Sequence, residues 1–303
     1  MRHGYRIARL RVAVALVAGL TGCANLEGVR DFTASSARIT AYRGVTDRAL
    51  ASPDYVLLEF PAGPAFDAFR AAAEADRLKA PQRKEALLKL QSVATGYMAA
   101  LAKLAGDDSF DLSGDIGKVS GQIALIPDLG ITAAQVSAYT TLAQTVTNWA
   151  TAAEQARDVK ALVLQYGEPM DTLLHGMETA TAAYIGILKN EQGAVLAIEQ
   201  SRQAFWQVPL KADGDPRSNE GIALANRRDA ILALSRRSYA QTAHEEADAI
   251  AAAQQAARGV RIVRTGHAEM LKNIDRLDNR DVVALLKKAA ADLKAIRSNL
   301  KAL

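Results

Sequence analysis

A heptad repeat at the end of the chain decides the fold: VVALLKKAAADLKAIRSNLKAL, residues 282–303. Apolar residues recur there every seven positions in two registers, at Val282, Ala289, Ile296 and Leu303 and at Leu286, Leu293 and Leu300. This spacing places one apolar stripe along an α-helix and is typical of a coiled coil or a long helical bundle. The rest of the chain therefore has to supply helices against which this stripe packs.

Similar stripes run through most of the sequence. Apolar residues follow steps of three or four within 132–166, 170–206 and 232–277, and a second heptad pattern occupies Leu87, Ala94, Leu101 and Leu90, Tyr97, Leu104. Alanine, the best helix former, makes up about one residue in five. We therefore predict an all-α fold, an elongated antiparallel bundle of long, coiled-coil-like helices, because short connections make consecutive long helices antiparallel.

Prolines and capping residues predict where the first helices begin and end. A helix is expected from Phe32 to Leu50, whereas residues 55–60 could be a strand or a helical turn. Pro64 and Pro81 each suit the first turn of a helix, where the missing N–H removes no hydrogen bond.

The same signals divide the middle of the chain. A short helix is expected at 115–126, and Thr132 and Gln135 have the spacing of a capping box that opens the next helix. Gly167 followed by Pro169 predicts that one helix stops and another starts.

The last part of the chain is expected to contain the clearest interior loop and the longest helix. The loop is residues 208–216, and the helix follows it. Gly259 and Gly266 are positions where this long helix could bend.

The first 23 residues differ from everything that follows. Residues 1–11 carry four arginines and no acidic residue, residues 12–20 (VAVALVAGL) are uncharged and apolar, and Leu20-Thr21-Gly22-Cys23 comes next. A basic stretch before a short apolar run is typical of a secretory signal, since the run is shorter than the roughly 20 residues that a membrane span requires. The ending resembles the lipobox of bacterial lipoprotein precursors.

This resemblance implies a specific set of modifications. Residues 1–22 would be cleaved off, the Cys23 thiol would receive a diacylglyceryl group, and the new amino group would receive an acyl chain such as palmitate. Two or three acyl chains give stable membrane anchoring. Ala24, where a retained lipoprotein would carry aspartate, implies sorting to the outer membrane of a Gram-negative envelope, facing the periplasm. The alternative is that Cys23 is an ordinary small residue next to a type I cleavage site.

The expected organisation is a cleaved signal peptide (1–22), a short lipid-anchored tether (23–31) and a single elongated helical-bundle domain (32–303). Without the four leader arginines the 37 basic residues fall to 33 and equal the 33 acidic ones, so the basic pI does not indicate nucleic-acid binding. Residues 258–303 hold eleven basic and five acidic residues, a net of +6. This segment could pack on a mildly acidic body or face anionic lipid or cell-wall polymer.

The sequence contains no motif of a known catalytic chemistry, and no cofactor is predicted. It lacks a Gly-x-Ser-x-Gly elbow and a His-Glu-x-x-His helix, and Cys23 is its only cysteine. Residues 113–118 look like a phosphate-binding loop but lack its first glycine. Asp107, Ser109 and Asp111 alternate like calcium ligands, yet Lys118 stands where the bidentate glutamate is required.

The histidines offer weak candidate sites. Asp171, His175 and Glu178 lie at i, i+4 and i+7 on one helix face, where they could hold a metal with a further ligand. Exposed Asp–His pairs are common on helices, so no metal is predicted there. Residues 244–246 (His-Glu-Glu) are expected to form a polar helix face. His267 interrupts an apolar stripe, either as a core-edge histidine bonded to a neighbour or as a pH-responsive residue.

Residues 119–131 (VSGQIALIPDLGI) form the most apolar connection in the chain. Ile126 and Leu129 occupy positions where a turn is normally polar. The turn could fold back onto the bundle as core, or it could be an exposed tip through which these two residues contact a partner.

The function that these observations favour is a non-catalytic, lipid-anchored component of the periplasmic envelope that binds a protein or cell-wall partner. One alternative is a membrane-active, pore-forming-like helical protein, with Ile123–Ile131 as the segment that would enter a bilayer. Another is a small-ligand carrier or enzyme whose site is dispersed over several helices. Nucleic acid is not an expected partner of any of these.

Overall fold

The computed structural model describes residues 26–39, 42–110, 121–151, 159–207 and 218–302. Within these ranges the regular elements are helices, and the β-structure is a single isolated bridge between Ile126 and Ile131. In chain order the elements are α1 (Glu27–Ala37), α2 (Tyr42–Leu50), α3 (Ser52–Glu59), α4 (Asp67–Leu104), η2 (Pro127–Leu129), α5 (Ala133–Thr151), α6 (Val159–Gln207), α7 (Asn219–Lys272), η3 (Ile274–Arg276) and α8 (Arg280–Ala302). The predicted all-α fold is confirmed.

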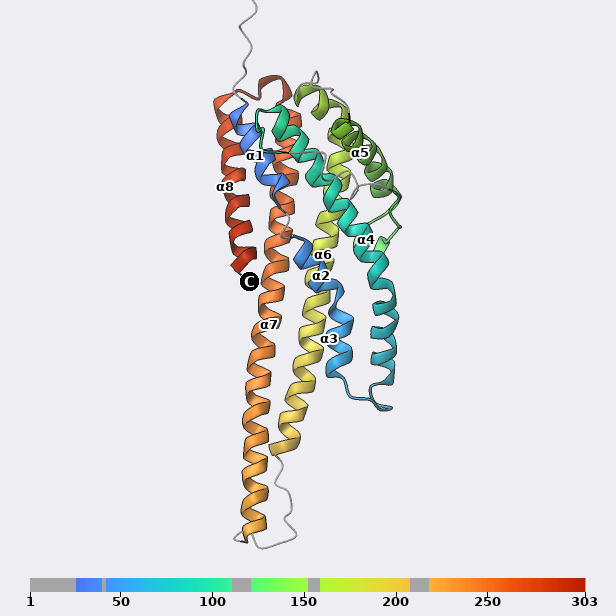
Figure 1. The fold of residues 1–303 in the computed structure, drawn as a ribbon, viewed down its shortest axis with the longest axis vertical. Coiled ribbons are helices and arrows are strands. Elements are labelled where there is room, and N and C mark those ends of the chain that lie inside the picture. The colour runs from blue at the N-terminus through green and yellow to red at the C-terminus, as the bar shows by residue number, and fades with distance from the viewer. Residues whose placement is uncertain (1–25, 40–41, 111–120, 152–158, 208–217, 303) are drawn as a thin grey trace, which may run out of the picture.

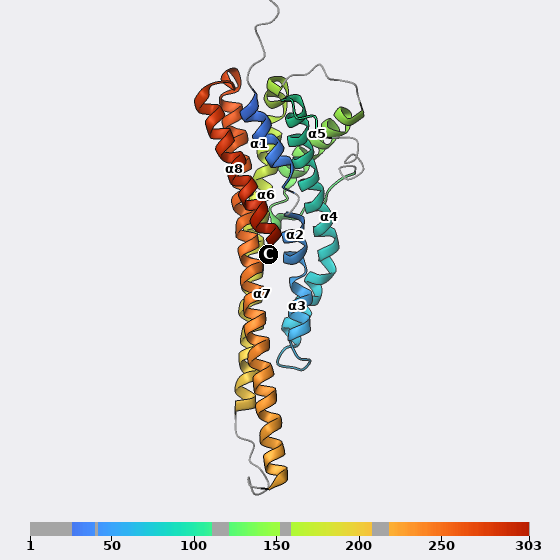
Figure 2. The same cartoon turned by 60° about the vertical axis from the view of Figure 1, so that its left-hand side comes forward.

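The molecule is a rod built on the antiparallel pair α6 and α7 (Figures 1 and 2). The 54 residues of α7 correspond to a length of about 80 Å. The other helices gather along one part of this pair, with α1 and α8 beside α7 and with α4 and α5 on the α6 side. The elongated antiparallel bundle is therefore confirmed as well, and α7 is the longest described helix, as expected.

The predicted apolar stripes form the core. The heptad positions Leu87, Leu90, Tyr97 and Leu101 of α4 are buried, as are Leu286, Leu293 and Ile296 of α8. The apolar stripes of α6 and α7 face the same core along the part of the rod where other helices cover this pair. Amphipathic stripes predict helices reliably because burial of one face supplies most of a helix's stability.

Two glycines of α7 allow other helices to approach closely. α7 continues through Gly259 and Gly266. A Cβ atom at Gly266 would lie 2.5 Å from the ring of Phe32 on α1, and one at Gly259 would collide with the Tyr42 hydroxyl on α2. Close packing of aromatic side chains from the N-terminal helices therefore explains both residues.

The beginning of the chain differs from the prediction. α1 begins at Glu27 rather than at Phe32, and Val29 is completely buried. The predicted tether of residues 23–31 is thus too long, because its second half belongs to the bundle. The expected helix from Phe32 to Leu50 is also divided into α1 and α2. Neither the early start of α1 nor its separation from α2 is evident from the sequence, because α1 contains few apolar side chains.

The structure also decides the undecided segment 55–60 and corrects the predicted place of Pro81. Residues 52–59 form α3, with Pro53 in its first turn, so the segment 55–60 is largely helical. Pro81 lies inside α4 instead of at its start. This part of α4 is exposed, so water can bond to the carbonyl that loses its N–H partner.

The stop signal at Gly167 and Pro169 is wrong, because α6 continues through both residues. Gly167 is buried, and a Cβ atom there would lie 3.1 Å from the Leu271 side chain of α7, so the glycine allows close helix packing. The expected short helix at 115–126 lies partly outside the described residues, and residues 121–126 are not helical. The predicted loop at 208–216 lies outside the described residues.

Candidate functional site

The predicted lipidation site, Cys23, lies outside the described residues. The first helix after it, α1, begins four positions later and lies at the opposite end of the rod from the start of α7 (Figure 1). A lipid on Cys23 would therefore hold this end of the rod at the membrane surface.

In the described part of the chain, no helix is both long enough and apolar enough for a transmembrane span.

The apolar turn before α5 packs as core. Ile126 and Leu129 are 6% and 3% exposed, and Ile126 forms a two-bond bridge with Ile131. Gly130 has the positive φ of 78° that closes the turn, and its backbone lies against α6. The interpretation of Ile126 and Leu129 as an exposed contact for a partner is therefore wrong.

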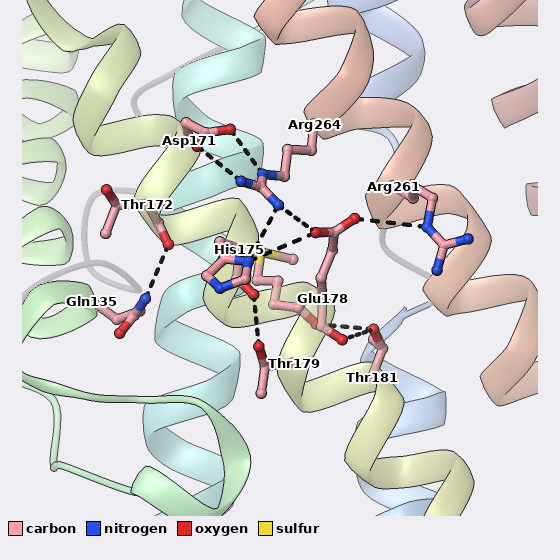
Figure 3. Close-up of polar contacts among 10 residues, drawn as sticks. Gln135, Asp171, Thr172, His175, Glu178, Thr179, Thr181, Arg261 and Arg264 are labelled. Atoms are coloured by element: carbon pink, nitrogen blue, oxygen red, sulfur yellow. Dashed lines mark hydrogen bonds and ion pairs between the residues drawn. The ribbon is translucent and has the colours of Figure 1, made fainter.

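The capping box after this turn is half formed. The Thr132 backbone N–H and hydroxyl both donate to the Gln135 side-chain oxygen, which holds the start of α5. The Gln135 amide donates to the Thr172 carbonyl of α6. The cap thus also ties α5 to α6 (Figure 3).

The candidate metal ligands of α6 surround an arginine of α7 (Figure 3). Arg264 donates to both carboxylate oxygens of Asp171, at 2.8 and 3.1 Å, and to Glu178 at 2.7 Å. One of its terminal nitrogens also lies 3.2 Å from His175 Nδ1. The three residues share one helix face, as predicted, but the cation among them is a guanidinium.

Electrostatics favour this ion cluster over a metal site. Hydrogen bonds from Arg264 hold the pKa of Asp171 below its usual range, and the bonds to Asp171 and Glu178 raise the pKa of Arg264. Among the described residues, no group of three or more His, Cys, Asp or Glu side chains is arranged to hold a metal ion. The weak metal candidate is therefore replaced by an interhelical ion cluster that fixes α6 against α7.

His267 is a core residue of the same helix pair. It is 1% exposed, and its Nε2 lies 3.2 Å from the Tyr97 hydroxyl of α4. Burial lowers the pKa of His267 to about 4, although the nearby Asp171 acts in the opposite direction. The histidine is therefore neutral near pH 7, in agreement with the core interpretation, and it lies deeper than the expected core edge.

Sequence reasoning missed a buried ion cluster farther along the rod. Arg48 of α2 makes two bonds to Glu191 of α6, at 3.0 and 2.7 Å, and one to Glu246 of α7, at 2.8 Å. Both glutamates are buried, and the Arg48 guanidinium also lies 4.0 Å from the centre of the Tyr55 ring. One cation thus serves two buried carboxyl groups from different helices.

This cluster has one negative charge more than Arg48 can balance. Burial, followed by the charge of Glu191, raises the pKa of Glu246 to about 7. Glu246 Oε2 is buried without a hydrogen-bond partner among the residues that the structure describes, which makes it the atom best placed to take the proton. The cluster can therefore change its protonation near neutral pH.

A register argument could have identified Glu246. It precedes Ile250 by four residues and Ala253 by seven, and both of those residues are buried. Position 246 therefore belongs to the buried stripe, while the neighbouring Ala247 is exposed. The expected polar face at 244–246 is wrong for Glu246.

A small cavity lies in the core between α1, α2, α4, α6 and α7. Its volume is about 30 Å³, which is room for about one water molecule. Most of its lining is apolar and includes the side chains of Met98, Met170 and Met177. Ser36, Tyr42, Gln91 and Thr95 add four polar side chains to this lining.

The far end of the α6–α7 pair is the other unusual region. We define the stalk tip as residues 200–207 of α6 and 218–245 of α7. None of these residues is buried, whereas α7 has a buried residue in nearly every turn from Glu246 onward. The two helices contact each other here through polar bonds, from Gln200 to Tyr239 and from Gln203 to the Ser235 carbonyl.

Comparison of this chain with models of known protein families, with curated proteins and with solved structures finds no match.

Proposed function

We propose that this protein is a lipid-anchored, non-catalytic component of a Gram-negative envelope, held at the periplasmic side of the outer membrane. Its helical body lies next to the membrane and presents the α6–α7 pair to a protein or cell-wall partner. The lipobox-like sequence ending in Cys23 supports the anchor and the location.

The observation that carries the proposal is the position of the two ends. α1, which follows Cys23 after three residues, lies at one end of the rod, and the stalk tip lies at the other (Figure 2). Anchoring at α1 would therefore leave the stalk extending away from the membrane surface. The ion clusters around Arg48 and Arg264 fix both long helices to each other, which suits a rigid spacer.

Processing provides the first test. We expect mature protein to begin at Cys23, to carry acyl chains and to fractionate with outer membranes. The Cys23→Ser variant should accumulate as precursor or be released. Mass spectrometry of the N-terminal peptide measures this directly, and an unmodified Cys23 would contradict the proposed anchor.

Crosslinking in cells tests whether the stalk binds a partner. A photoreactive residue replacing Ala240, which is exposed on the stalk, should trap a specific species that mass spectrometry can identify. The same residue replacing Leu58, which is exposed on α3 of the body, provides the control. Equal labelling at the two positions would argue against the stalk as the binding surface.

A further inference from the structure

The stalk tip exposes large apolar side chains on both helices. Phe205 is 67% exposed and Leu234 is 68% exposed, and Ile222 and Leu224 are about half exposed. Phe205 also makes an edge-to-face contact with Trp206, with ring centres 5.3 Å apart. Aromatic and aliphatic side chains are thus open to solvent at the free end of the rod.

These side chains do not share one face. A helix turns by about 100° per residue, so Leu224 and Leu234 point roughly 200° and 120° away from Ile222 around α7. A protein partner normally covers one face of a helix, with its large anchors gathered in a central patch. An environment that surrounds the helix end from several sides fits this distribution better.

The charges at the start of α7 are predominantly positive. Residues 218–240 hold four arginines and two acidic residues, Glu220 and Asp229, a net of +2. Asp229 lies 3.6 Å from Arg228. The other three arginines are exposed and contact no acidic side chain within the part of the chain that the structure describes: Arg227, Arg236 and Arg237.

From this combination we infer that the stalk tip binds the surface of an anionic lipid bilayer. Arginines attract phosphate headgroups, tryptophan favours the interface, and the aliphatic side chains enter the boundary of the acyl region. A fluid bilayer can accept apolar side chains from all sides of a helix end. The protein would then contact one membrane through its N-terminal anchor and a second, anionic surface through the stalk tip.

The test uses the full-length protein bound to neutral phosphatidylcholine vesicles through its own N-terminal segment. Trp206 becomes the single fluorescent reporter in a Trp149→Phe background, since the chain has two tryptophans. Adding vesicles that contain phosphatidylglycerol should shift the Trp206 emission to the blue and link the two vesicle populations. High salt should reverse both effects, because it screens the arginines.

Two variants separate the electrostatic contribution to membrane binding from the apolar contribution. Replacing Arg227, Arg236 and Arg237 by Gln should weaken the apparent affinity for anionic vesicles by about tenfold or more. Phe205→Asp with Ile222→Asp should abolish the blue shift. The control is Leu58→Asp with Leu78→Asp, two equally exposed apolar positions on the body, which should leave binding unchanged.

The inference fails if Trp206 does not respond to anionic vesicles, or if the arginine variant and high salt leave the response intact. It also fails if Phe205→Asp instead breaks a dimer seen in sedimentation, because the tip would then bind a second copy of the chain. The Trp206 emission shift does not depend on acylation of Cys23, whereas the linking of the two vesicle populations does. Failure of the proposed anchor therefore remains distinguishable from failure of this inference.

Discussion

The same two helices, α6 and α7, form two very different regions in one molecule. Along the body, α1, α2, α4 and α8 cover them, and side chains such as Leu173 and Val260 are almost completely buried. At the stalk tip no residue is buried, although Glu59 of α3 still pairs with Arg202 of α6. Two α-helices alone cannot enclose a core, so burial and stability depend on the additional helices.

The largest expected effect contrasts the two regions directly. Leu173→Asp in the body should lower the free energy of unfolding by about 4 kcal/mol or more, because it removes apolar burial and leaves a charge without a partner. Leu234→Asp at the stalk tip should cost less than about 0.5 kcal/mol. Urea unfolding of both variants measures this, and equal losses would show that the tip is covered.

The heptad of α8 provides the next test. Leu293→Asp should destabilise the protein by about 3 kcal/mol or more, since Leu293 is 1% exposed in the α8 seam. The adjacent Lys294→Ala should cost less than about 0.5 kcal/mol because Lys294 is exposed. Similar melting temperatures for these variants would mean that α8 does not help to cover α7.

The burial of neutral His267 predicts that the protein loses stability in acid. Its pKa of about 4 in the fold lies below its ordinary value of 6.5, so the neutral form is favoured by folding. The resulting stability is present above pH 6.5 and is lost as the pH falls toward 4, by roughly 3 kcal/mol. His267→Gln should flatten this part of the stability profile, and an unchanged slope would contradict the burial of a neutral histidine.

The turn before α5 tests a surface that the sequence left undecided. Leu129→Glu should lower stability by about 2 kcal/mol, because it places a carboxylate against α6. Leu125→Glu is the matched control, since Leu125 is 59% exposed four residues earlier. A stable Leu129→Glu variant would reopen the interpretation of this turn as a docking tip.

The last prediction concerns the Arg48 cluster, which lies near the boundary between the body and the stalk. The pKa of Glu246, about 7, lies above its ordinary value of 4.5, so folding favours the protonated form. This stability is present below pH 4.5 and is lost as the pH rises through 7. The Glu246→Gln variant should be more stable than the unchanged protein at pH 8. If the stability of the two proteins changed in parallel with pH, the raised pKa of Glu246 would be contradicted.

The two titrations have opposite signs between pH 4.5 and 6.5. The double variant of His267→Gln and Glu246→Gln should therefore show the flattest profile across pH 4–8. Measuring all four proteins in one series tests whether the two sites act independently, as their separation along α7 predicts.

Local sequence determined the helices and their apolar stripes. The heptads of α4 and α8 follow from helix geometry alone, since 3.6 residues per turn bring every third or fourth side chain to one face. The same periodicity, with the scarcity of proline, determined the all-α class and the elongated shape. The N-terminal signal pattern is likewise a property of residues 1–23, independent of any packing.

Tertiary structure decided what each position is used for. Gly167 and Pro169 have the local pattern of a helix end, yet α6 continues through both, and Gly167 packs against Leu271 of α7. Glu246 has the polarity of a surface residue, yet it is buried because Arg48 of a distant helix pairs with it. Local pattern gives a residue's preference, whereas the helices that happen to cover it determine whether that preference is satisfied or overridden.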